Sequence, residues 1–131
     1  MSDFKKLKVW RKGHALALNV RRAAVEIRGP DNAALRNQML RASMSVPTNI
    51  VEGAGQQSQR QFARFIGIAL NSTSELEYHL IVARDAAVIT RSDAESLLDQ
   101  TIEVRKMLHG LLNRVLTLPR KPTKESQAVV N

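Results

Sequence analysis

Four apolar patterns with a helical period constrain the fold of this chain more than any other feature. Small or apolar residues recur in alternating steps of three and four along residues 9–27, 35–50, 62–87 and 97–118. Such steps place side chains on one face of an α-helix, which must then be buried against a partner. The breaks between the patterns are short, and short connections favour antiparallel neighbours. We therefore predict an all-α fold, an antiparallel up-down-up-down four-helix bundle.

The break "RGPDN" after the first pattern contains both stop and start signals. Gly29 can adopt a left-handed cap, and Pro30 cannot continue a helix. Asp31 or Asn32 can then cap the second helix, because a short oxygen-bearing side chain accepts from its free N–H groups.

Two capping boxes mark the starts of the later helices. Ser58 with Gln61, and Ser92 with Glu95, have the three-residue spacing in which a hydroxyl accepts from a first-turn N–H. We expect the third and fourth helices to begin at these serines.

Pro47 lies inside the second apolar pattern. A proline within a helix removes one hydrogen bond and crowds the preceding turn, so a kink is expected there. The carbonyl of Ser43 then lacks its usual donor, and Thr48, Ser45 or a water molecule is expected to serve it.

The residues after Pro47 predict a corner between the second and third helices. Asn49 and Glu52 share a helix face, while Gly53 and Gly55 permit a tight turn. We interpret this corner as structural, with a buried or half-buried polar cluster that fixes the turn. The alternative is a ligand or nucleic-acid contact built from Asn49, Glu52 and the N–H groups around Ser58. The predicted structural corner comprises Ser45, Pro47, Asn49, Glu52 and Gly53.

Length and composition indicate a single domain. A chain of 131 residues with 44% apolar content supports one core. We expect the bundle to span residues 1–118, followed by a basic, disordered tail at 119–131, where two prolines occur without a helical period. The chain has no cysteine, no signal-peptide core and no apolar run near the roughly 20 residues of a membrane span. A cytoplasmic protein without membrane contact is expected.

The net charge of +8 is concentrated at the two chain ends. Residues 1–12 carry +4 and residues 119–131 carry +2, which leaves +2 for everything between them. In the predicted topology both chain ends meet the corner between the second and third helices. We name this cationic set the basic end and predict that it binds nucleic acid: Lys5, Lys6, Lys8, Arg11, Lys12, Arg60, Arg64, Arg114, Arg120 and Lys121. The alternative is that these charges only increase solubility.

Patterns typical of enzymes are absent from the sequence. The Glu-x-x-His pairs of a di-iron bundle are missing, and Glu75 with His79 is interpreted as a pair on one helix face. No phosphate-binding glycine loop or nucleophile elbow occurs. We therefore expect no catalytic residue, no metal site and no cofactor. Five aromatic residues are too few for a stacking surface, so phosphate contacts are expected to supply most of the affinity.

Surplus apolar side chains beside the core stripes predict a homo-oligomer. They are Ile66, Ile68 and Leu70 in the third helix and Leu98, Ile102, Leu112 and Leu116 in the fourth. A lone bundle of this size buries about one broad face per helix. The alternative is a wide core face without subunit contact.

The stretch "RASMSVPTNIVEG", the serine-led helix "SQRQFARFIGIALNSTSELE" and the early "KVW" resemble the family of 23S rRNA intervening-sequence proteins, which includes accessory proteins of diversity-generating retroelements. The resemblance covers roughly residues 4–118. It is carried by Arg41, Ser45, Pro47, Asn49, Ile50, Glu52, Gly53, Ser74, Glu75 and Leu76. It implies a four-helix bundle that assembles as a homopentamer, nucleic-acid binding in some members, and no enzyme.

Taken together, these features favour a non-enzymatic oligomeric accessory protein that binds RNA or DNA through its basic end, with little sequence specificity. The alternative is a protein-interaction scaffold that does not bind nucleic acid directly.

Overall fold

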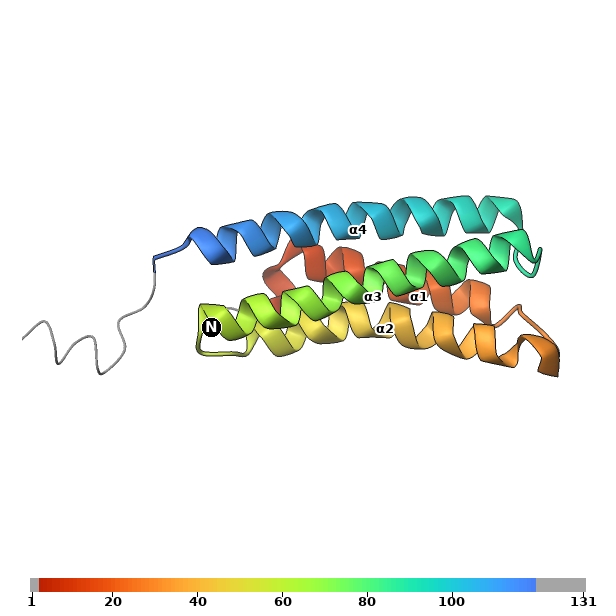
Figure 1. Cartoon of the computed structure of the whole chain (residues 1–131), viewed down its shortest axis with the longest axis horizontal. Coiled ribbons are helices and arrows are strands. Elements are labelled where there is room, and N and C mark those ends of the chain that lie inside the picture. The colour runs from red at the N-terminus through yellow and green to blue at the C-terminus, as the bar shows by residue number, and fades with distance from the viewer. Residues whose placement is uncertain (1–2, 120–131) are drawn as a thin grey trace, which may run out of the picture.

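Four long helices lie side by side in the structure, a computed structural model that describes residues 3–119 (Figure 1). They are α1 (Lys8–Ala24), α2 (Ala33–Ala54), α3 (Gln59–Asp85) and α4 (Arg91–Thr117). Short 3-10 helices, η1 (Phe4–Lys6) and η2 (Pro30–Asn32), precede α1 and α2. Both α1 and α3 pack against α2 and α4, and successive helices run in opposite directions (Figure 1). The predicted all-α up-down-up-down bundle is confirmed, and residues 3–119 contain no strand.

The predicted apolar stripes form the core. Seven large side chains from all four helices are completely enclosed: Leu16, Met39, Ile50, Ile66, Leu76, Leu80 and Leu108. Each such side chain stabilises the fold by about 1.5–3 kcal/mol relative to exposure. Two threonines on the stripes are also buried, and each hydroxyl donates to a carbonyl of its own helix: Thr73 to Leu70 and Thr101 to Leu97, both at 2.7 Å. Their burial therefore leaves no hydroxyl unpaired.

Ile66, which was expected to belong to the surplus apolar surface, is fully buried in the core. Ala87, which was expected to end the third stripe, is exposed. It follows α3 in a left-handed conformation with φ of 55°. The amide of Val88 donates to the carbonyl of Ala83 at 3.0 Å, which closes the end of the helix in a Schellman-type turn.

The third helix begins as predicted, whereas the fourth begins earlier. Ser58 Oγ accepts from the Gln61 amide at 3.1 Å at the start of α3. At α4 the cap is Thr90, whose Oγ1 accepts from the Asp93 amide at 3.0 Å. The prediction of Ser92 as the cap is wrong because Thr90 is the last residue with extended backbone before the helix. Thr90 and Asp93 have the same three-residue spacing as Ser92 and Glu95.

The first turn depends on Gly29, whose φ of 92° is unfavourable for any residue with a Cβ. Asn32 stands at the cap position of α2, but its side chain makes no capping bond there. Its Nδ2 instead donates to the carbonyl of Arg28 at 3.3 Å. Ile27, the last residue of the first apolar pattern, is buried although α1 ends at Ala24.

None of the helices between residues 3 and 119 combines the length and the apolar content needed to cross a membrane. Of the tail predicted at residues 119–131, the structure describes only Pro119, so the predicted boundary of the bundle remains a prediction.

Candidate nucleic-acid interface

The bundle topology brings three separate parts of the chain to one end of the molecule. The start of α1, the turn between α2 and α3, and the end of α4 lie together there (Figure 1). η1 contacts α2 as well as α1. Gln59 Nε2, at the start of α3, donates to the carbonyl of Pro119 at 3.2 Å. This bond links the turn between α2 and α3 to the chain leaving α4.

Eight of the ten residues predicted to form the basic end lie in the described part of the chain. All eight side chains are exposed: Lys5 and Lys6 in η1, Lys8, Arg11 and Lys12 in α1, Arg60 and Arg64 in α3, and Arg114 in α4. Arg120 and Lys121 lie outside the described residues. The interface remains a prediction, and none of the eight described side chains is buried.

Two cations of the basic end, Arg11 and Lys12, make a hydrogen bond or an ion pair within the described part of the chain. Arg11 Nη1 donates to the carbonyl of Lys5 at 3.1 Å and so holds η1 against α1. Lys12 Nζ lies 3.6 Å from Glu103 Oε1, and both side chains are about half exposed. An exposed ion pair of this kind contributes about 0–1 kcal/mol and opens at little cost. Lys12 therefore remains available to an anion.

Charge is distributed unevenly along the bundle axis. The half nearer the basic end, residues 3–18, 46–66 and 104–119, contains ten basic and two acidic residues, a net charge of +8. The other half, residues 19–45 and 67–103, contains seven basic and nine acidic residues, a net charge of −2. Because a cluster of one sign raises the local concentration of counter-charged ligands, this distribution favours an anion at the basic end.

A polar cluster joins α2 to α3 in the region of the predicted corner. The hydroxyls of Ser45 and Ser72 lie 2.7 Å apart across the two helices. Asn49 Nδ2 donates to the Ser45 carbonyl at 2.8 Å and to Ser45 Oγ at 3.0 Å. These polar groups are half-buried or buried and bond to one another, which is the structural arrangement expected of Asn49.

Glu52 lies outside this cluster, in contrast to our expectation, because its side chain is exposed. Three residues along a helix correspond to about 300° of rotation, so Glu52 is turned about 60° from the direction of Asn49. Gly53 is buried, and a Cβ there would lie 2.8 Å from Phe62 Cδ1 and 3.0 Å from Phe65 Cβ. Gly53 therefore allows the close approach of α2 and α3, whereas Gly55 has an ordinary helical φ of −82°.

Pro47 is buried within α2, and the helix continues past it to Ala54. Its Cα lies 3.9 Å from the position of a Cβ on Gly13, where α1 crosses close to α2. The Thr48 hydroxyl, one of the donors considered for the Ser43 carbonyl, donates instead to the carbonyl of Met44 at 2.8 Å.

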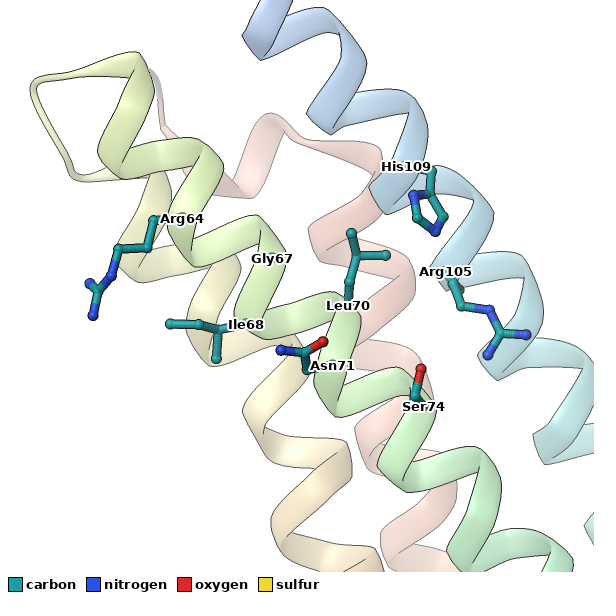
Figure 2. Close-up of a pocket in the computed structure, with 8 residues that line it drawn as sticks. All are labelled: Arg64, Gly67, Ile68, Leu70, Asn71, Ser74, Arg105 and His109. Atoms are coloured by element: carbon teal, nitrogen blue, oxygen red, sulfur yellow. The ribbon is translucent and has the colours of Figure 1, made fainter.

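An open groove runs between α3 and α4 (Figure 2). Figure 2 shows Leu70 and His109 near each other across it, whereas Arg64 and Ile68 extend away from α4. Arg105, which lines the groove, donates from Nη1 to Glu77 Oε1 at 2.7 Å, and both side chains are about three-quarters buried. Arg64, a member of the basic end, is also among the residues that line this groove.

Sequence reasoning did not find an aromatic stack in this region, made of Phe4, Trp10 and His14. The Trp10 and His14 rings are stacked with centroids 5.1 Å apart, and Phe4 meets Trp10 edge-on at 4.9 Å. The four-residue spacing of Trp10 and His14 on one helix face was the available signal. By contrast, the predicted pairing of Glu75 with His79 is not made through Nδ1, which is buried without a hydrogen-bond partner.

Among residues 3–119 no three histidine, aspartate or glutamate side chains lie close enough together to hold a metal ion.

Comparison with known proteins identifies a family and solved structures with a similar fold. The family of 23S rRNA-intervening sequence proteins matches residues 5–110. A crystal structure of a protein of unknown function from the S23 ribosomal protein family of Bacteroides thetaiotaomicron superposes with a TM-score of 0.75 at 27% identity. The match covers 79% of this chain and 97% of that one. Among curated proteins nothing matches. Because the family match spans most of the bundle and a solved member of the S23 family shares its fold, this chain belongs to the 23S rRNA-intervening sequence protein family.

Proposed function

We propose that this chain is a non-enzymatic, homo-oligomeric accessory protein that binds RNA or DNA at its basic end. Lysine and arginine side chains contact phosphates there, so most of the affinity is electrostatic and the sequence of the ligand matters little. The family name refers to 23S rRNA, which makes RNA the first ligand to test.

The observation that carries the proposal is the separation of charge along the bundle, +8 in one half against −2 in the other. The basic residues come from η1, α1, α3 and α4, which meet only because of the fold. All eight described members of the basic end are exposed, so none of them is needed to balance a buried carboxylate.

The test is a gel-shift titration of the full chain with generic RNA and DNA at several salt concentrations. Phosphate-driven binding must weaken steeply as salt rises, with a slope of about −0.9 per duplex phosphate contact. We expect binding to both nucleic acids at low salt and a slope of several units. Absence of binding to either at low salt would exclude the proposal and favour the protein-interaction scaffold.

Oligomerisation is the second part of the proposal and rests on exposed apolar surface. Leu116 is 64% exposed, Tyr78 63% and Met44 55%. Ile68 and Ile102 are half-buried, while Leu70, Leu98 and Leu112 already pack partly against the core. The resemblance implies a pentamer. Light scattering at micromolar concentration is expected to give a multiple of 14.6 kDa, and the monomer mass would contradict this part of the proposal.

A further inference from the structure

The aromatic stack of Phe4, Trp10 and His14 lies inside the most basic segment of the chain. No acidic residue occurs between Asp3 and Glu26, while five lysines and arginines lie between residues 4 and 13. The stack is thus surrounded along the chain by groups that attract phosphates. Its rings present a different chemistry, because an aromatic face binds bases rather than phosphates.

The three rings differ in how far they are exposed to solvent. Phe4 and Trp10 are half-buried and pack against the hydrophobic core, whereas His14 is exposed. The planes of Trp10 and His14 differ by only 4°. The exposed imidazole is therefore the accessible end of a stack whose inner members are held by the core.

The position of the stack is fixed before any ligand arrives. Trp10 and His14 are four residues apart on α1, which orients both rings on one face. Phe4 is held by η1, which the bond from Arg11 to the Lys5 carbonyl fastens to α1. A preorganised surface loses little conformational entropy on binding.

We propose that the aromatic stack binds an unpaired nucleobase on the outer face of His14, so that the basic end prefers single-stranded to duplex nucleic acid. In a duplex each base is already stacked on both sides, whereas an unpaired base offers a free π-face. The neighbouring lysines then contact the phosphates of the same strand. This inference rests on the proposed function and adds the class of nucleic acid to it.

The experiment compares three ligands of equal length: a single-stranded oligo-dA, the same strand with abasic sites, and a duplex. The abasic strand keeps the phosphates and lacks the bases. Trp10 is the only tryptophan in the chain, so its emission reports on the stack directly. We expect the base-containing strand to bind about 5-fold or more tightly than the abasic strand and to change Trp10 emission, which the abasic strand leaves unaltered. A single-stranded oligo-rA tests whether RNA behaves in the same way.

Variants of the exposed ring separate stacking from a purely structural role. His14→Ala should lose the preference for bases yet keep its affinity for the abasic strand, and His14→Phe should retain the preference because an aromatic face remains. His109→Ala is the matched control, since His109 is also exposed and lies on α4. Trp10→Ala is unsuitable because Trp10 packs against the core.

The other outcomes test two proposals, base stacking on His14 and nucleic-acid binding at the basic end. The stacking inference is overturned by equal affinity for the base-containing and abasic strands, by a duplex that binds as tightly as the single strand, or by an unchanged or increased base preference in His14→Ala. In each case the proposed function stands if binding is salt-dependent. Absence of binding to all three ligands overturns both.

Discussion

The two ends of the bundle both consist of helix ends and connecting turns, but they differ in net charge and in the backbone conformation of the turns. At the basic end α3 packs closely against Gly53 in the last turn of α2, and the turn between α2 and α3 has no positive φ. At the far end Gly29 has φ of 92° and Ala87 has φ of 55°. Net charge is +8 on the first half and −2 on the second. The comparison teaches that one core can carry two ends with independent surface properties, because the start of α1, the end of α4 and one turn meet at the same end.

The largest expected effect comes from removing charge at the basic end. Replacing Lys5, Lys6 and Lys8 together by glutamine should weaken binding to all nucleic-acid sequences alike, on the order of 10- to 500-fold at 0.1 M salt if each lysine neutralises up to one phosphate. The salt slope of a gel-shift titration should fall by about 0.9 per lost duplex contact.

The matched control for this triple is at the far end. Replacing Arg28, Arg84 and Arg91 by glutamine should change binding little, because the fold places them away from the basic end and Arg84 and Arg91 face Asp85 and Glu95 at 3.0 and 3.8 Å. If the far-end triple abolished binding and the near-end triple did not, the electrostatic account of the basic end would be wrong.

The next effect concerns packing at the corner. Gly53→Ala should destabilise the protein by about 1–3 kcal/mol, because the added methyl would lie 2.8 Å from the Phe62 ring and the helices must separate. Urea unfolding measures this loss. Gly55→Ala is the control: its nearest neighbours are carbonyl oxygens at 3.7 Å and its φ is −82°, so it should be neutral or slightly stabilising. Equal losses of stability in both variants would mean that the close contact between Gly53 and Phe62 is not the cause of the loss in Gly53→Ala.

The fold was predictable because its signals are local and repeated. Each apolar stripe has a period of three and four, and the cap at Ser58 follows from a three-residue spacing. The start of α4 was not predictable from spacing alone, since Thr90–Asp93 and Ser92–Glu95 match the same pattern. What decided between them was backbone conformation, which follows from how the preceding turn folds after Ala87.

The candidate site was predictable in part for a similar reason. Charge along the chain can be counted, and helix topology then brings the start of α1 and the end of α4 to the same end of the bundle. The aromatic stack depends on η1 folding Phe4 back onto Trp10, a contact that the sequence does not specify. The role of Glu52 was misjudged because sharing a helix face with Asn49 does not fix how deeply a side chain is buried.

A smaller effect distinguishes the two polar residues of the corner. Asn49→Ala should cost about 0.5–1.5 kcal/mol, because its amide donates to both the carbonyl and the hydroxyl of Ser45. Glu52→Ala should change stability by less than about 0.5 kcal/mol, as expected for an exposed side chain. Chemical denaturation of both variants measures the difference. A larger loss in Glu52→Ala than in Asn49→Ala would restore Glu52 to the structural cluster.

The smallest effect tests the far-end turn against the turn at the basic end. Ala87 adopts φ of 55°, a left-handed conformation that crowds its Cβ, and its side chain is exposed. Ala87→Gly should therefore stabilise the protein by about 0.5–1 kcal/mol, because relief of this strain exceeds the added entropy of the unfolded chain. Ala86→Gly is the matched control: Ala86 has φ of −82°, so the same substitution next door brings only the entropic loss and should destabilise by a similar amount. Thermal unfolding of the two variants should shift in opposite directions. A destabilised Ala87→Gly protein would show that the left-handed turn carries no strain, and the contrast between the turns at the two ends would then reduce to close packing at Gly53.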